Sequence, residues 1–279
     1  MSDAFGSGPA ADPREYADRL TAELAALLGP ALTGAYLHGS AALGGWVAER
    51  SDVDLLFVVA DDVTSGAVTA AGNLLTASDG CPGRGLDCSV VTTRQAARPA
   101  PPWPFLLHVG SRDGTPALFQ GTSMPGDADL IMHYAVCLAA GIRLAGPPPA
   151  DAIGKVGGPT VLRYLAGELA WGLANAPECY AVLNACRALV YLDEDRIVSK
   201  VAGGLAALEQ GTGPAGLVRR ALDQQRGRVP EQRPGTDAVS FVRKVAAALS
   251  DAAALSDAAG LSDTAGLSDG CARGMAGRN

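Results

Sequence analysis

The sequence is poor in aromatic side chains and in basic residues, and each shortage excludes a class of protein. Aromatics make up 5% of the 279 residues, so alanine, leucine and valine must build most of the core. Lysine and arginine number 22 against 29 acidic residues, which gives a net charge of −7. Nucleic-acid binders gain affinity from basic residues that release counterions. The charge balance therefore disfavours a nucleic-acid partner and suits a cationic small molecule.

Targeting sequences and cysteine-based metal-binding motifs are also missing. No run of 18 apolar residues occurs, and the first residues form no basic and apolar leader, so we expect a cytoplasmic protein without a membrane segment. The six cysteines form no CxxC pair, and none has a histidine companion at ligand spacing. Free thiols in a reducing compartment are expected. His38, His108 and His133 are likewise expected to be structural.

The first half of the chain carries strand patterns after one well-marked helix. Asp12 is the expected N-cap of that helix, with Glu15 completing a capping box, and Gly29-Pro30 ends it. The segment Val53–Ala60 is almost continuously apolar, which is typical of a strand covered on both faces. Further strands are predicted over residues 33–38, 86–92 and 104–109.

The second half has helical apolar spacing, and its connections suggest where the domains end. From Asp127 the pattern predicts a helix through Ile142, and GPPPAD at 146–151 breaks the chain. We predict an α+β fold in which a mixed-sheet domain precedes an all-α helical bundle. Later helices are predicted over 160–175, 179–191, 200–210, 214–226 and 237–250. The predicted parts are a disordered leader at 1–11, the sheet domain at 12–148, the bundle at 149–250 and a low-complexity, disordered tail at 251–279.

One stretch carries the pattern of a chemical site. Asp52 and Asp54 are two residues apart at a strand start, so both carboxylates project from one face. Asp87 lies in another strand with the same alternation, and Gly39-Ser40 forms a turn whose N–H groups could approach a phosphate. Closely spaced carboxylates repel one another unless a cation lies between them, and their oxygens suit Mg²⁺. The pattern predicts metal-assisted phosphoryl or nucleotidyl transfer.

The combination of GS, a spacer and SDVDLLFVV resembles the signature of the polymerase-beta-like nucleotidyltransferase superfamily. The resemblance extends over residues 14–250. In order, LHGSAALGGWVAERSDVDLLFVV, GLDCSVVT, DADLIMHYAVCLAAGIRLAGP and AVLNACRALVYLDEDRIVSK are similar to the aminoglycoside nucleotidyltransferases that adenylylate streptomycin and spectinomycin. The family implies a nucleotidyltransferase domain followed by a helical domain. It also implies ATP as co-substrate and two Mg²⁺ ions.

The resemblance implies a role for each matched residue. Asp52, Asp54 and Asp87 fall at metal ligands, and Asp87 also falls at the catalytic carboxylate. Where the characterised enzymes usually carry Glu, this chain has Asp87, whose shorter side chain favours metal ligation over a general-base role. The matched nucleotide-binding positions are Gly39, Ser40, Ser51, Arg187 and Lys200.

The acceptor site is predicted from residue type and place in the chain, and core packing of Trp171 and simple solvation of Glu178 stay open as alternatives. Trp103, Trp171 and Glu178 are candidates to stack on and anchor a cationic aminoglycoside. The expected reaction is AMP transfer from Mg-ATP to a hydroxyl of such a molecule, which modifies an antibiotic, by a monomeric enzyme. Two alternatives stay open. The acceptor could be a protein or a metabolite, or the chain could bind nucleotide as a sensor without turnover.

Overall fold

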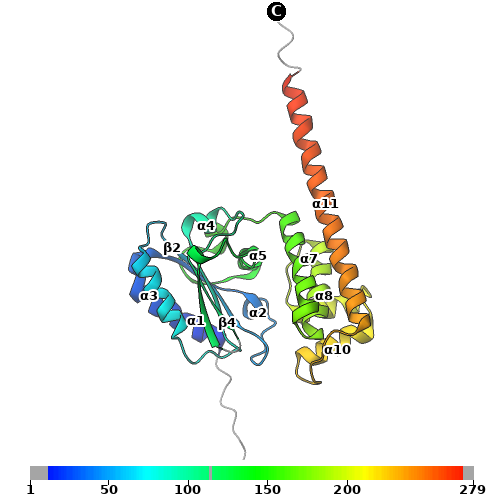
Figure 1. Ribbon diagram of the computed structural model, residues 1–279, viewed down its shortest axis with the longest axis horizontal. Coiled ribbons are helices and arrows are strands. Elements are labelled where there is room, and N and C mark those ends of the chain that lie inside the picture. Colours follow the sequence, from blue (N-terminus) through cyan, green and yellow to red (C-terminus); the bar gives the residue numbers. More distant parts are fainter. Residues whose placement is uncertain (1–11, 113–114, 273–279) are drawn as a thin grey trace, which may run out of the picture. The chain divides into compact units, whose positions relative to one another are not determined.

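The computed structural model describes residues 12–112 and 115–272, with side chains described as far as residue 258 (Figure 1). The chain divides into two units. One comprises the residues up to Val156 together with Ile197–Ala202, and the other comprises Gly157–Arg196 and the residues from Gly203 onward. The predicted leader at 1–11 lies outside the described residues.

The boundary between the units falls later than the sequence suggested. We expected the first domain to end at residue 148, but it continues to Val156. The N–H of Gly154 donates to the carbonyl of Ala96 at 2.9 Å, and Ile153 is 5% exposed. These contacts hold the segment after GPPPAD against the first unit, so the chain break marks a turn and not the end of the domain.

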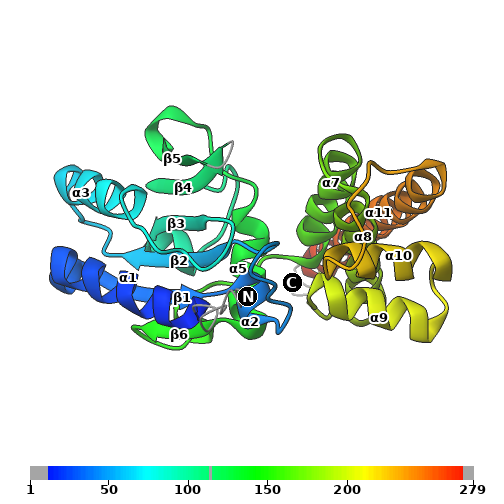
Figure 2. The ribbon, with the colours of Figure 1, turned by 90° about the horizontal axis from the view of Figure 1, so that it is seen from below.

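A mixed six-stranded sheet forms the first unit, which confirms the predicted α+β class. Its order is β5-β4-β3-β2-β1-β6, and only the β2–β3 pair is parallel (Figure 2). The strands are β1 (Leu32–Leu37), β2 (Val53–Val59), β3 (Leu86–Thr92), β4 (Leu107–Arg112), β5 (Thr115–Gln120) and β6 (Ile142–Ala145).

Helices cover both faces of this sheet. In Figure 2, α1 and α3 lie on one side of the strands, and α5 lies on the other. The predicted N-cap of α1 is confirmed, although the Asp12 carboxylate accepts the N–H of Arg14 at 2.9 Å and forms no capping box with Glu15. The helices of this unit are α1 (Pro13–Leu28), α2 (Gly39–Ala42), α3 (Ser65–Thr76), α4 (Thr93–Ala97), α5 (Leu130–Ala140) and α6 (Pro149–Ala152), with 3₁₀ turns at Gly29–Ala31 and Gly121–Ser123.

Strand alternation separates the core from the polar face of the sheet. Leu55 and Phe57 of β2 are fully buried in the cluster beneath α1 and α3, together with Cys88 and Val90 of β3. Side chains alternate along a strand, so the intervening residues of β2 and β3 project toward the opposite face. That face, on the side of α5, carries the predicted carboxylates.

One strand prediction and one helix prediction need correction, and one strand was missed. The predicted strand at 104–109 begins only at Leu107, because Pro104 has no N–H to donate to a ladder. The helix expected to continue through Ile142 ends at Ala140, where Gly141 donates its N–H to the carbonyl of Cys137 at 2.8 Å. Ile142 instead begins β6, and β5 was not predicted at all.

The second unit contains only helices among its described residues, as predicted. They are α7 (Gly158–Asn175), α8 (Glu178–Glu194), α10 (Ala215–Gln225), α11 (Thr236–Ala272) and all but the start of α9 (Lys200–Gln210). No helix in the described part of the chain is long and apolar enough to span a membrane. The five cysteines with described side chains are free thiols, as expected.

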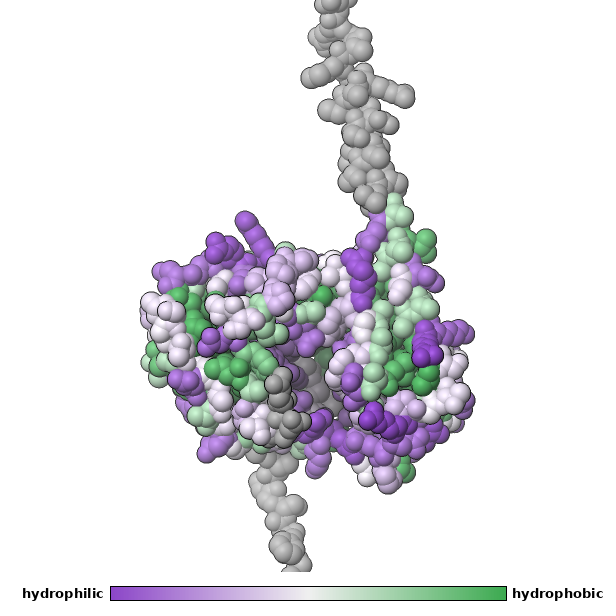
Figure 3. Space-filling model, viewed as in Figure 1, coloured by the Kyte–Doolittle hydropathy of each residue, from purple (hydrophilic) through white to green (hydrophobic). Residues whose placement is uncertain are grey.

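The predicted tail is partly structured, which corrects the sequence analysis. Helix α11 runs without a break from Thr236 to Ala272, well past the predicted end of the bundle at 250 (Figure 1). Ala253 is 1% exposed, and Asp257 accepts a 2.6 Å hydrogen bond from Arg163 of α7. Pale green apolar side chains run along the described part of α11 in Figure 3, and Leu255 is 72% exposed. The leucines of this segment are six residues apart and form no continuous apolar face on a helix. The high helical propensity of the many alanines, together with these contacts, extends the helix.

Ending the chain at Ser250 should therefore lower its melting temperature by about 2–6 °C, since about 1–2 kcal/mol of packing is lost. The truncation removes buried Ala253 and the Arg163–Asp257 pair. A chain ending at residue 258 keeps both contacts and should melt like the full chain. Thermal unfolding of all three proteins measures the effect. Equal melting temperatures for the two truncations would show that residues 251–258 contribute nothing.

Candidate active site

Two of the predicted carboxylates meet on adjacent strands. Asp54 of β2 and Asp87 of β3 are direct partners in the parallel ladder. Partners in a parallel ladder lie about 4.8 Å apart and point to the same face. Each is flanked by core residues of opposite orientation, so both carboxylates emerge beside α5. The strand pairing therefore brings together two like charges that are 33 positions apart in sequence.

The electrostatics of this pair favour a bound cation. Burial, followed by repulsion from Asp87, raises the pKa of Asp54 from 3.8 to about 7. Burial also raises the pKa of Asp87 to about 6, while His108 opposes that shift. A buried carboxylate pair cannot ionise fully without compensation. A divalent cation supplies that compensation, and carboxylate oxygens are its preferred ligands.

The Gly39-Ser40 turn lies directly over Asp54. Gly39 has φ +59°, and a Cβ built on it would lie 1.7 Å from Oδ2 of Asp54. The backbone N–H of Ser40 donates to the Asp54 carboxylate and lowers its pKa slightly against the larger effect of burial. Only glycine permits this close approach of the backbone to a carboxylate. The Ser40 hydroxyl is buried and has no hydrogen-bond partner among the described residues, which leaves it available to a ligand.

Asp52 lies at the edge of the site. Burial raises its pKa, and Arg84 and Lys200 oppose the shift. Lys200 belongs to the segment Ile197–Ala202 that groups with the sheet, so the structure brings this predicted nucleotide-binding residue to the predicted metal ligands. The hydroxyl of Ser51 instead accepts the N–H of Val47 at 3.1 Å and shapes the connecting loop.

The described residues contain no group of three or more His, Cys, Asp or Glu side chains arranged to hold a metal ion. The structure thus brings Asp54 and Asp87 together but does not complete the three-carboxylate cluster predicted with Asp52. The buried Asp87 Oδ1 has no hydrogen-bond partner within the described chain. This orphaned oxygen and the repelling pair fit a divalent cation whose remaining ligands come from substrate phosphates and water.

Three residues near the carboxylates were missed in the sequence analysis. Nδ1 of His108 lies 4.0 Å from Asp87 Oδ1, and the charges of Asp127 and Asp129 also raise the Asp87 pKa after burial and Asp52. His108 was expected to be structural because β4 was placed too early, which hid its pairing with β3. The two aspartates precede α5, and no motif marked them.

The remaining histidines form a buried pair behind the turn. The rings of His38 and His133 lie 4.8 Å apart, and His38 is 2% exposed. Burial, followed by the charge of His133, lowers the pKa of His38. The pair packs between β1 and α5 and supports the backbone that leads into Gly39.

Two predicted site residues of the helical unit, Trp171 and Arg187, have side-chain groups that could contact a ligand. Trp171 of α7 is 51% exposed and makes an edge contact with Tyr180 at a centroid distance of 5.9 Å. Arg187 of α8 has a buried Nε without a hydrogen-bond partner among the described residues. A Cβ on Gly203 would lie 2.6 Å from the Arg187 backbone N, so α9 packs closely against the turn of α8 that carries this arginine.

Glu178 has a structural role, contrary to the prediction that it anchors the acceptor. Its side chain is 0% exposed, and one oxygen accepts hydrogen bonds from Arg220 at 2.7 Å and Gln232 at 3.1 Å. The other accepts the N–H of Gly235 at 3.3 Å. Burial acts to raise the pKa of Glu178, but these hydrogen bonds outweigh it and lower the pKa. A carboxylate with all its oxygens engaged cannot also bind a cationic ligand.

Trp103 lies in a cavity of about 520 Å³ that the carboxylates do not line. Its neighbours there include Thr92 at the carboxyl end of β3, whereas Asp87 is near the amino end of that strand. Arg98 and Tyr134 also line the cavity. The carbonyl of Trp103 accepts the N–H of Asp127 at 2.9 Å. Because the charge of Asp127 acts on Asp87, Trp103 is linked through Asp127 to the carboxylates, although they do not line its cavity.

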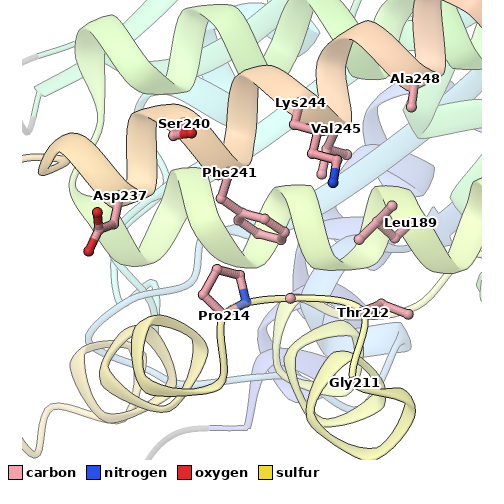
Figure 4. A pocket seen from close by; sticks show the side chains of 11 residues that line it. Leu189, Gly211, Thr212, Pro214, Asp237, Ser240, Phe241, Lys244, Val245 and Ala248 are labelled. Carbon is pink, nitrogen blue, oxygen red and sulfur yellow. The ribbon is translucent and has the colours of Figure 1, made fainter.

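A second cavity, of about 510 Å³, lies within the helical unit. Phe241 points from α11 toward Pro214, with Lys244 and Asp237 on either side of it along the helix (Figure 4). None of the predicted site residues lines this cavity. The predicted nucleotide and acceptor residues of the helical unit are therefore not part of this cavity.

The comparisons with known proteins agree with this arrangement. Residues 162–250 match the family model described as aminoglycoside adenylyltransferase, C-terminal domain. Among solved structures, spectinomycin adenyltransferase AAD(9) from Enterococcus faecialis, crystallised with ATP and spectinomycin, matches with a TM-score of 0.60 at 18% identity. The match covers 86% of this chain and 98% of that chain, and it shows a shared fold. No curated protein matches the sequence.

Proposed function

We propose that the chain is a member of the aminoglycoside adenylyltransferase family and that it transfers AMP from Mg-ATP to a hydroxyl group of an aminoglycoside-like antibiotic. The observation that carries this proposal is the facing pair Asp54 and Asp87 beneath the Gly39-Ser40 turn. Paired carboxylates and a backbone turn without side-chain bulk supply the two needs of nucleotidyl transfer, a metal site and a phosphate cradle.

In the proposed mechanism the sheet unit binds the nucleotide. Asp54 and Asp87, with Asp52 at the edge, would hold two Mg²⁺ ions, and the ions would supply positive charge to offset that of the triphosphate and of pyrophosphate. The buried hydroxyl of Ser40 and the turn's backbone receive the phosphates, and Ser51 holds the loop in place. Lys200, whose charge already acts on Asp52, supplies a cation to the phosphates.

Asp87 takes the proton of the attacking hydroxyl in this mechanism. A carboxylate within reach of the acceptor hydroxyl can act as its general base. The hydroxyl oxygen attacks the α-phosphorus, the bond to the β-phosphate oxygen breaks, and pyrophosphate leaves. Asp87 thereby gains the proton, and the acceptor gains AMP.

A cationic acceptor suits the chain for two reasons. The protein carries a net charge of −7, and Trp171 presents a half-exposed aromatic face of the kind on which sugar rings stack. The matching family model describes an aminoglycoside adenylyltransferase domain, and the similar solved structure contains ATP and spectinomycin. We extend the proposal to a monomer acting in the cytoplasm, where its free thiols stay reduced.

Pyrophosphate release tests the proposal. The chain is incubated with Mg-ATP and a panel containing spectinomycin, streptomycin and other aminoglycosides, and adenylylated product is identified by mass spectrometry. We expect release with at least one antibiotic and none without an acceptor. Asp54→Asn serves as the inactive control, and exposed Asp62→Asn as the active one.

Other outcomes point to the alternative functions. Release that requires a protein or metabolite extract, with no response to the antibiotic panel, would replace the acceptor while keeping the chemistry. Tight ATP binding without release under any condition would contradict the enzyme and favour a nucleotide sensor. Calorimetry with ATP and Mg²⁺ distinguishes that outcome from a protein that binds no nucleotide.

A further inference from the structure

His108 lies against the carboxylate at the centre of the candidate site. The pairing of β3 with β4 sets His108 directly opposite Ser89, which is two residues beyond Asp87 on the same face. Nδ1 of His108 lies 3.0 Å from the Ser89 hydroxyl oxygen and 4.0 Å from Oδ1 of Asp87. The imidazole therefore has a hydrogen-bonding atom between a hydroxyl and the carboxylate.

The surroundings confine the imidazole to this orientation. A Cβ on Gly110 would lie 2.9 Å from Nε2 of His108, so the ring occupies the space that this glycine leaves open. The ring of Phe119 packs against it at a centroid distance of 5.9 Å. The His108 side chain is 16% exposed. Gly110 and Phe119 thus flank the ring, and its Nδ1 lies on the side of Ser89 and Asp87.

The Asp87 carboxylate needs such a partner. Its Oδ1 is buried and has no hydrogen-bond partner in the described part of the chain. An unsatisfied buried acceptor is costly, and more so when it is charged. The 4.0 Å separation from Nδ1 is about 1 Å beyond a hydrogen bond. A small rotation of either side chain would close this gap.

We propose that His108 is a positioning residue for Asp87, donating its Nδ1–H to Oδ1 and directing Oδ2 toward the metal and the acceptor hydroxyl. This inference rests on the proposed function of the site. Without the donor, the carboxylate could rotate about its last bond and present either oxygen. The side chain of aspartate is short, so its carboxylate depends on neighbours for its orientation. His108, with Ser89 beside it, thus fixes the orientation of the Asp87 carboxylate.

A pair of substitutions separates this role from packing. His108→Phe keeps a ring beside Gly110 and Phe119 but removes Nδ1, whereas His108→Asn places an amide N–H close to the Nδ1 position. We expect His108→Phe to lower kcat by about 10–100-fold, the usual effect of losing such a supporting hydrogen bond. The KM for ATP should change little. His108→Asn should recover most of kcat.

A kcat unchanged in His108→Phe would overturn the proposal. Equal losses in both variants, accompanied by a lower melting temperature, would show that the ring only packs.

A measurement without turnover keeps this test independent of the proposed function. Nitrogen NMR of the metal-free protein reports the tautomer and hydrogen bonding of each imidazole. Asp87→Asn should move the Nδ1 resonance of His108, because the charged acceptor is replaced by a neutral amide. An unmoved resonance would contradict the contact even in an active enzyme. A moved resonance in a protein that adenylylates nothing would instead contradict the proposed function alone.

Discussion

Replacing Gly39 with alanine should lower turnover by about 100-fold or more. The new methyl group would lie 1.7 Å from Oδ2 of Asp54, so either the turn or the carboxylate must move. Either movement separates the phosphate cradle from the metal ligand, and a displacement of 1 Å can cost about 10²-fold in rate. The left-handed φ of +59° adds about 1–2 kcal/mol of backbone strain for alanine. Steady-state kinetics with Mg-ATP and the identified acceptor measure the loss.

Gly44→Ala provides a matched control in the same loop. Gly44 has φ +66°, but nothing lies within 4 Å of the position its Cβ would take. This variant carries the backbone strain without the collision. It should lower the melting temperature somewhat and keep most of the turnover. If the two variants lost turnover equally, the close approach of Gly39 to Asp54 would have no special importance.

Asp54→Asn should lower turnover by about 10²–10⁴-fold. The amide keeps an oxygen that can accept the N–H of Ser40, but it removes the charge that binds the cation. Metal stabilisation of transition-state charge contributes several kcal/mol, and each 1.36 kcal/mol is tenfold in rate. A variant that keeps more than a few per cent of wild-type turnover would contradict the assignment. Asp62→Asn, at an exposed position, controls for the change in net charge.

The same substitution should change how stability depends on pH. The pKa of Asp54 is raised from 3.8 to about 7 by folding, so the folded state prefers the protonated form. The metal-free wild type is therefore stabilised by this group at low pH and loses that contribution as pH rises from about 4 to about 7. Asp54→Asn should melt above wild type at pH 8, and the difference should shrink at pH 4. Thermal unfolding in EDTA tests this, and an Asp54→Asn variant that melts lower at pH 8 would contradict it.

Local patterns predicted the parts of the fold that depend on local structure. The continuous apolar run gave β2 because a strand covered on both faces has no polar alternation, and Asp12 with Pro13 marked the start of α1. Edge strand β6 is only four residues long and begins directly after a glycine helix end, so helical spacing masked it. The extent of α11 depends on contacts such as Arg163–Asp257, which sequence spacing does not show.

The sequence predicted the site residues whose positions follow from the alternation of a single strand or from a local turn. It did not predict those that reach the site only because two strands pair. Asp52 and Asp54 follow from period-two alternation, and the Gly39-Ser40 turn follows from its place between two strands. The contact of His108 with Asp87 depends on the β3–β4 register, which no sequence signal gives. Glu178 was misjudged because its partners, Arg220 and Gln232, are more than 40 positions away.

Residues Ile197–Ala202 belong to the sheet unit although they lie in the second half of the chain. The two halves of the chain are therefore not independent folding or functional modules. The chain leaves the sheet unit at Val156, returns for these few residues, and leaves again within α9. Ser199 fills the space beside Gly45, where a Cβ on the glycine would lie 2.5 Å from it, and Lys200 acts on Asp52. A gene fragment cut at the apparent boundary would lose both. Exchange of the helical half between relatives, in evolution or in the laboratory, must therefore transfer part of the proposed nucleotide site with it.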